Sequence, residues 1–282
     1  MSAVNAAVAA AIAKAAERTN MNEAQKGGGG DYVPPAEGLC RLRFVAYIEL
    51  GKHHDEKFNK TRDKVMLTFE LSGPKHEAKK LEDGTLLPHR ISITENLSLN
   101  EKANFYKLFR AMNYDGSATH IAQLLGNEFL GTVVHNKSKD GKRTYANLRG
   151  DSGYTIRKPY VEDPETGEVR KIPAAPQISE TRCFLWDYAD KAMWDSIFID
   201  GEYEAEKNDA GEITRPARSK NVFQNQIKTA VNFPGSPIAE ILENGALNLG
   251  DDAVTETPAA DPAANPEQVS EAEGHDPLEG IQ

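Results

Sequence analysis

Residues 39–50 read LCRLRFVAYIEL, and apolar side chains occupy every even-numbered position of this stretch. Such a period of two is typical of a strand with one buried and one exposed face. We expect the buried face to carry Leu42, Phe44, Ala46, Ile48 and Leu50. The opposite face would then carry Arg41, Arg43, Val45 and Tyr47.

Two more strands are predicted on the C-terminal side of this one. Residues 64–71 (KVMLTFEL) alternate again, and residues 90–95 (RISITE) form a shorter alternating stretch. Residues 51–62 (GKHHDEKFNKTR) are rich in Lys, Arg and His and separate the first two strands. The pattern predicts a basic loop there.

Helices and a hairpin follow. Ser98 and Glu101 have the spacing of a capping box, which predicts a helix start before the apolar positions 105, 108, 109 and 112. A second short helix is expected over 118–125, ending at Gly126. Strands are expected at 129–136 and 143–149, joined by a turn at Asp140-Gly141.

Three strands, a helical segment and two more strands make up the element order of the OB-fold, a five-stranded barrel. We therefore expect a mainly β chain with some helix, in which residues 31–150 form an OB-fold barrel. Residues 151–245 would be an α+β extension with a hairpin at 160–171, a Trp-containing segment at 182–203 and a helix at 220–230. Both ends would lie outside the barrel: an Ala-rich helix and glycine linker at 1–30, and a disordered tail at 246–282.

Charge is distributed unevenly along the 282 residues. The net charge is -10, which by itself disfavours a nucleic-acid partner. However, residues 251–282 hold 9 acidic residues and no Lys or Arg, while residues 31–150 hold 19 Lys and Arg against 15 Asp and Glu. The predicted barrel is therefore slightly basic, and the predicted tail carries nearly all of the negative excess.

Proteins hold single strands by cations that follow the phosphates and by aromatic rings that stack on bases. OB-folds do so with the second and third strands and the loops around them. Three basic groups fit that placement, on the first strand, in the first loop and on the last hairpin. The phosphate-binding candidates are Arg41, Arg43, Lys52, Lys57, Lys60, Arg62, Lys64, Lys137, Lys139, Lys142, Arg143 and Arg149. Each group alone is also compatible with an ordinary solvated loop.

The stacking candidates are Tyr47, Phe58 and Tyr145. Phe58 lies in a charged loop, whereas Tyr47 and Tyr145 lie opposite the apolar faces of their strands, where packing is an equal alternative. The other aromatic residues considered fall on apolar faces or are tryptophans, and we expect them in the core: Phe44, Phe69, Phe105, Phe109, Trp186 and Trp194.

Few patterns point to catalysis, a metal or a membrane. Cys40 and Cys183 lie far apart without CxxC spacing, which disfavours a zinc site and a disulfide scaffold. The sequence His53-His54-Asp55-Glu56 is interpreted as a solvated loop rather than a metal site. No GxSxG or HExxH motif and no phosphate-binding glycine loop occurs. No apolar run is long enough to span a membrane, and no secretory leader is found. We therefore expect a non-enzymatic, soluble, intracellular protein without a cofactor.

Several segments, taken in order, resemble phage-encoded single-stranded DNA-binding proteins. GLCRLRFVAYIELGKH and DKVMLTFEL are similar to the first strands of that family, and SLNEKANFYKLF to the helix after its third strand. LLGNEFLGTVVHNKSKDGKRTYANL is similar to its last hairpin, and FLWDYADKAMWDSI to a segment that follows the barrel. The resemblance covers roughly residues 38–235 and rests on the order of these segments rather than on any one.

The resemblance implies an OB-fold that coats single-stranded DNA in phage replication or recombination, in the host cytoplasm. It also implies an acidic tail that competes with DNA and recruits replication or recombination proteins. Many tails of that family end in an aromatic residue, whereas this chain ends in Ile281-Gln282, so a partner of that kind is not implied. Two alternatives remain open: a phage structural or interaction protein without DNA binding, and a phage DNA enzyme such as a nuclease, for which Glu77 and Lys79 would be a starting motif.

Overall fold

The computed structural model describes residues 33–56, 58–138, 141, 144–207, 213–247 and 269–270. These residues belong to two units, one made of residues 33–201 and the described residues from 219 onward, the other of residues 202–218. Strands dominate and helices are few, as the sequence predicts. The predicted helix and glycine linker at 1–30 lie outside the described residues, as does most of the predicted tail.

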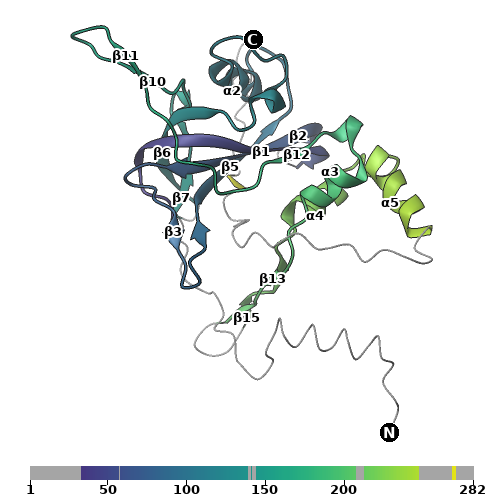
Figure 1. The fold of residues 1–282 in the computed structure, drawn as a ribbon. Coiled ribbons are helices and arrows are strands. Elements are labelled where there is room, and N and C mark those ends of the chain that lie inside the picture. Colours follow the sequence, from purple (N-terminus) through teal and green to yellow (C-terminus); the bar gives the residue numbers. More distant parts are fainter. Residues whose placement is uncertain are drawn as a thin grey trace. The chain divides into compact units, whose positions relative to one another are not determined.

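The larger unit is built on an antiparallel sheet in which the strand order is β5-β2-β1-β6-β7 (Figure 1). All five of its strands were predicted, and their bounds are β1 Gly38–Asp55, β2 Lys60–Ser72, β5 His89–Asn96, β6 Glu128–Lys137 and β7 Thr144–Asn147. β1 and β2 are much longer than predicted. The basic segment between them is therefore mostly strand, and only a short turn joins the two.

The sheet is open, so the prediction of a closed barrel is wrong. Closure would require β5 to pair with β7, but β7 has only four residues and no ladder joins the two strands. The free edge of β5 is instead met at Ser92–Ile93 by β17 (Val269–Ser270), two residues of the predicted tail. The gap toward β7 is crossed by a side-chain contact, in which the Tyr154 hydroxyl donates to the Glu95 carboxylate.

A bulge in β1 overturns the predicted assignment of its two faces. The register against β2 shifts between Phe44 and Ala46, and again between Glu49 and Gly51. Because a shift of one residue exchanges the faces of a strand, Tyr47 joins Leu42 and Phe44 in the first core. Ile48 and Leu50 face a second core on the other side.

The first core lies between the sheet and the helical segment before β6. α2 (Asn104–Met112) begins six residues after Ser98, and its N-cap Ala103 makes no side-chain hydrogen bond, so the predicted capping box is wrong. The predicted helix at 118–125 is a single 3-10 turn, η1 (Ile121–Leu124), capped by His120 and Gln123. Both segments pack their predicted apolar residues against the core, although Phe109 and Leu125 are only half-buried.

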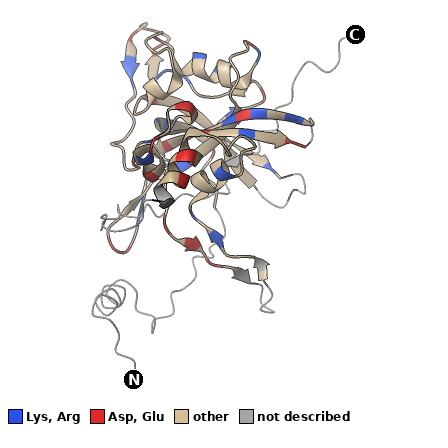
Figure 2. Cartoon of the chain, turned by 90° about the vertical axis from the view of Figure 1, so that its right-hand side faces the viewer, with Lys and Arg blue, Asp and Glu red and all other residues tan. Residues whose placement is uncertain are grey.

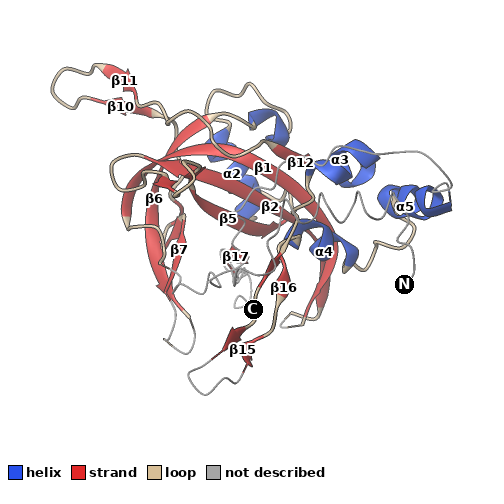
Figure 3. Cartoon of the chain, turned by 60° about the horizontal axis from the view of Figure 1, so that its bottom comes forward, coloured by secondary structure: helices blue, strands red, loops and turns tan. Residues whose placement is uncertain are grey.

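The second core joins the predicted extension to the sheet, and residues 150 and 151 lie in the same compact unit. Ile48, Leu50 and Met66 of the β1–β2 ladder pack there against Trp194 and Ile227. The elements that supply this layer are β12 (Arg182–Phe184), which runs parallel to β1, η2 (Trp186–Tyr188), α3 (Lys191–Ser196), α4 (Val222–Lys228) and α5 (Pro237–Leu247) (Figure 3). α4 corresponds to the helix predicted at 220–230, whereas α5 was not predicted.

Short hairpins complete the described residues. In the larger unit they are β3 (Lys79–Lys80) with β4 (Leu86–Leu87), β8 (Arg149–Gly150) with β9 (Gly153–Tyr154), and β10 (Tyr160–Glu162) with β11 (Val169–Lys171). The last of these is the hairpin predicted at 160–171. In the smaller unit, β14 (Glu206–Lys207) pairs with β15 (Ile213–Arg215). The remaining two-stranded pair is β13 (Glu202–Tyr203) with β16 (Arg218–Ser219).

Candidate nucleic-acid interface

The outer end of the β1–β2 hairpin gathers basic residues that are spread over thirteen positions of the sequence. The register is continuous there and pairs Gly51 with Lys64, His53 with Arg62, and Asp55 with Lys60. Directly paired residues share a face, and side chains alternate along a strand. Lys60, Arg62 and Lys64 therefore project from one face of β2, which we call the cationic row.

The cationic row has the geometry of a linear anion contact. Every second residue of an antiparallel strand is roughly 6.8 Å further along, so three such cations span about 14 Å. Lys60 is exposed, and Arg62 and Lys64 are half-buried. Asp55 lies opposite Lys60 and offsets part of the charge, while Lys52 lies on the other face opposite Asp63.

The base of this hairpin is fixed by the second core. The amide of Val231 donates to the carbonyl of Lys52 at 2.7 Å, and the amide of Lys52 donates to Asn232 Oδ1 at 2.7 Å. A β-carbon at Gly51 would lie 2.3 Å from the ring of Trp186, so only glycine fits there. These contacts fix the position of the hairpin at Gly51 and Lys52 relative to the second layer.

His53 does not add to the positive charge at neutral pH. Burial lowers the pKa of its ring, the Lys64 charge lowers it further, and the Leu50 carbonyl opposes both. Because the ordinary value is already 6.5, His53 is neutral at pH 7. The charge of the row comes from Lys and Arg.

The turn of the hairpin holds Phe58, which the sequence predicted as a stacking residue. Phe58 is half-buried, and its amide donates to Asp55 Oδ1 at 3.4 Å. Asn59 next to it has a positive φ of 47°, which tightens the turn. Lys57 lies outside the described residues.

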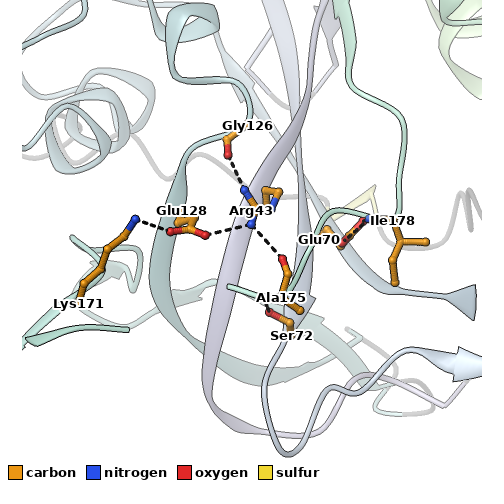
Figure 4. Close-up of polar contacts among 8 residues, drawn as sticks. All are labelled: Arg43, Glu70, Ser72, Gly126, Glu128, Lys171, Ala175 and Ile178. Atoms are coloured by element: carbon orange, nitrogen blue, oxygen red, sulfur yellow. Dashed lines mark hydrogen bonds and ion pairs between the residues drawn. The ribbon is translucent and has the colours of Figure 1, made fainter. Parts of the chain in front are cut away.

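Arg43 is predicted to bind phosphate, but the structure commits it to protein contacts (Figure 4). Its guanidinium donates to the carbonyl of Gly126 at 2.9 Å, to Glu128 Oε1 at 3.0 Å and to the carbonyl of Ala175 at 2.9 Å. Its side chain is only 17% exposed. Arg41 is half-buried on the same side of β1.

Residues 172–181, which we call the strap, cross the sheet at Arg43. Glu70 Oε1 accepts the amide of Ile178 at 3.1 Å (Figure 4). Glu70 Oε2 accepts the amide of Ser179 at 2.7 Å. Ser72 Oγ accepts the amide of Ala175 at 3.1 Å. The strap thus covers polar groups of β1 and β2, and Arg43 holds it in place.

Glu128 links Arg43 to the hairpin β10–β11. Lys171 Nζ lies 2.7 Å from Glu128 Oε2, on the opposite side of the carboxylate from Arg43 (Figure 4). Burial acts to raise the pKa of Glu128, but Lys171 and Arg43 together hold it below its ordinary value. The carboxylate is therefore ionised at neutral pH and neutralises Arg43.

The third basic group lies toward the other end of β1. β6 pairs with β1 from Arg43 back to Gly38, so the β6–β7 hairpin extends past Gly38, away from Asp55. Lys137 is exposed there and Tyr145 is half-buried, while Lys139, Lys142 and Arg143 lie outside the described residues. The structure therefore does not bring this group together with the cationic row.

Two other predicted residues are engaged in the fold. Tyr47 is fully buried, and its hydroxyl donates to Glu49 Oε1 at 2.9 Å, so its ring offers no face to a base. Arg149 Nη1 lies 3.6 Å from Glu95 Oε1, and its guanidinium lies over the ring of Tyr154.

The most exposed aromatic residue among those described, Tyr188, was not singled out from the sequence. Tyr188 of η2 is 79% exposed. It lies two residues after Trp186, whose ring meets Gly51 next to the cationic row. Its position follows from the contact of Trp186, in the same turn, with β1, and no periodicity in the sequence indicates that position.

Lys and Arg are interspersed with Asp and Glu along the described strands and loops (Figure 2). Within those residues, no group of three or more His, Cys, Asp or Glu side chains could hold a metal ion. Cys40 is buried and Cys183 half-buried, and both are free thiols. No helix among the described residues has the length and apolarity needed to cross a membrane.

Comparison with known proteins gives no relative. No family model matches the chain, and no curated protein or solved structure is significantly similar to it.

Proposed function

We propose that this chain binds single-stranded DNA without sequence preference and without catalysis, as a phage protein of replication or recombination. The observation that carries the proposal is the cationic row of Lys60, Arg62 and Lys64 on one face of β2. Regularly spaced cations on a rigid strand suit a flexible polyanion, because such binding needs charge and reach rather than a shaped pocket.

The sheet supports the same proposal. The order β5-β2-β1-β6-β7, with a helix between β5 and β6, agrees with an OB-fold whose third and fifth strands have not paired. In that fold the loop between the first two strands is one of the ligand-binding loops. The β1–β2 hairpin holds that place in this chain.

The geometry narrows the proposed contact residues. Lys60, Arg62 and Lys64 would meet phosphates, and Phe58 and Tyr188 would offer rings to bases. Lys52 is left out because it lies on the other face of the ladder. Arg43, Tyr47 and Arg149 are left out because their contacts hold the fold together. Lys137 and Tyr145 would take part only if the DNA also reaches the far end of β1.

The test is a salt titration of oligo-dT binding by fluorescence anisotropy. For single strands the slope of log K against log salt is about −0.7 for each phosphate neutralised. The triple substitution of Lys60, Arg62 and Lys64 to Ala should therefore flatten the slope by about 2. Lys79 and Lys80 are both exposed on β3, and their double substitution to Ala is the control for lost charge.

The control should keep the slope and the affinity of the unaltered chain. If the triple variant folds normally, as judged by circular dichroism, and retains the full slope, the cationic row is not the interface. If the two variants lose affinity equally, the binding is a general charge effect. Either result would contradict the proposal that the cationic row is the DNA-binding surface.

A further inference from the structure

The hairpin β10–β11 projects from the sheet as a ribbon, and no third strand pairs with either of its edges in the described part of the chain. It forms a two-stranded sheet of its own and extends away from the main sheet (Figures 1 and 3). All of its strand residues are exposed, among them Val161 at 42% and Val169 at 57%. An isolated two-stranded ribbon is only marginally stable in water, and unpaired edges invite further pairing.

The ribbon is nevertheless held in a defined shape. At its tip, Asp163 Oδ1 accepts the amides of Glu165 and Thr166, and Gly167 has a φ of 71°. At its base, Lys171 pairs with Glu128, and the Tyr160 ring contacts the Tyr114 ring. A ribbon fixed at both ends presents its edges in a constant geometry.

Hydrogen bonds within the ribbon show which backbone groups face outward. Ile172 N donates to Pro159 O, and Asp163 N donates to Glu168 O. Hydrogen-bonded and non-hydrogen-bonded pairs alternate in an antiparallel ladder. The amide and carbonyl groups of Val161 therefore face β11, and those of Tyr160 and Glu162 face the free edge of β10.

We propose that the free edge of β10 pairs antiparallel with β10 of a second copy of this chain, in a symmetric dimer centred on Val161. In this register Tyr160 and Glu162 of each copy form a hydrogen-bonded pair with Glu162 and Tyr160 of the other. The two Val161 side chains then meet at the non-hydrogen-bonded position, where side chains approach most closely. A two-fold contact of this kind is closed and self-complementary.

Charge favours the same register. The tip of the ribbon carries Glu162, Asp163, Glu165 and Glu168 without a basic residue between them. The antiparallel alignment brings this acidic tip beside Arg157 and Lys158 at the base of the other copy, and both of these are exposed. The edge of β11 lacks this charge complementarity, because a register centred on Arg170 would place two guanidinium groups opposite each other.

This inference does not depend on DNA binding. Three residues per strand make a contact smaller than the roughly 1,200–2,000 Å² of stable interfaces. We therefore expect a weak dimer whose population rises with protein concentration.

The test is site-specific cross-linking of the full chain. At the centre of the proposed ladder the two Cα atoms would lie about 4.5 Å apart, within the range of a disulfide. Val161→Cys should give a disulfide-linked dimer under mild oxidation with glutathione. Val169→Cys, on the other strand and more exposed, should remain monomeric, as should the unaltered chain with its Cys40 and Cys183.

Sedimentation velocity provides the second measurement. Val161→Glu should raise the dimer dissociation constant at least tenfold, whereas Val169→Glu should leave it within twofold. Arg157→Glu and Glu165→Lys, at positions that lie opposite each other in this register, should each weaken the dimer, and the double variant should restore it. A chain that stays monomeric at the highest attainable concentration, or a Val169→Cys variant that cross-links as readily as Val161→Cys, would overturn the proposal.

Discussion

At the scale of single residues, the two long strands owe their arrangement to a few positions where only one side chain fits. Gly51 is the clearest of these. Its φ is +80°, and a β-carbon there would meet both Trp186 and Ala230. The tryptophan can pack against β1 only because the glycine has no side chain, so one residue decides how the second core reaches the base of the hairpin.

Gly51→Ala should destabilise the fold more than the conformational strain alone explains. Gly84 provides the matched control, since its φ is +86° and a β-carbon there meets nothing within 4 Å. Both variants lose glycine's freedom at positive φ, about 1 kcal/mol. Gly51→Ala should lose about 1–3 kcal/mol more in urea unfolding, because it overpacks the core at Trp186. Equal losses would mean that Trp186 moves aside at no cost.

Sequence periodicity could be trusted at this scale wherever the backbone is regular. It placed Phe69, Phe105 and Leu124 in the core correctly. It failed at Tyr47 because a bulge between Phe44 and Ala46 inserts one residue into the pattern. The residue types at this point do not indicate a bulge. It also failed to show that Arg43 is engaged, since its acceptors Gly126 and Ala175 are 83 and 132 positions away in sequence.

At the scale of elements, the gap between β5 and β7 is bridged by side chains rather than by a ladder. Glu95 on β5 is buried, accepts the hydroxyl of Tyr154 on β9 and lies beside Arg149 on β8. Burial raises the pKa of Glu95, and the hydrogen bond and Arg149 only partly oppose this. The ionised carboxylate therefore costs the folded state free energy at neutral pH, and the hydrogen bonds and the positive charge around it reduce that cost.

Tyr154→Phe should lower the free energy of unfolding by about 1–3 kcal/mol at neutral pH, because it leaves the buried carboxylate with one donor fewer. The penalty should shrink as the pH falls through the raised pKa of Glu95, since the protonated acid no longer needs the donor. Urea unfolding at a series of pH values measures this. Tyr188→Phe, which removes an exposed hydroxyl, should have no effect. A penalty that is independent of pH would show that the carboxylate is not its source.

The elements themselves were largely predictable, whereas their ends and their closure were not. Alternation found the five strands of the sheet and the hairpin β10–β11. The predicted capping box at Ser98 failed because the chain makes a turn at Asn100 before α2 begins, with the amides of Lys102 and Ala103 bonded back to Asn100. Barrel closure depends on pairing between strands that are distant in sequence, and local periodicity carries no information about such pairing.

At the scale of the whole chain, the body and the predicted tail differ in charge. Residues 251–282 carry 9 acidic residues without a compensating cation. The proposed contact on the β1–β2 hairpin is basic, so an acidic segment of the same chain would compete with DNA for it. Apart from Val269 and Ser270, the tail lies outside the described residues. Its recruitment of partner proteins therefore stays a prediction.

The proposed function requires a preference for single strands over duplex DNA, which parallel binding titrations measure. The full chain is titrated into fluorescently labelled oligo-dT and, in parallel, into a duplex of the same length, with anisotropy recorded at low and moderate salt. We expect salt-sensitive binding to oligo-dT that is at least tenfold tighter than binding to the duplex. A chain that binds neither, or binds the duplex equally well, would contradict the proposed function and favour a protein-interaction role.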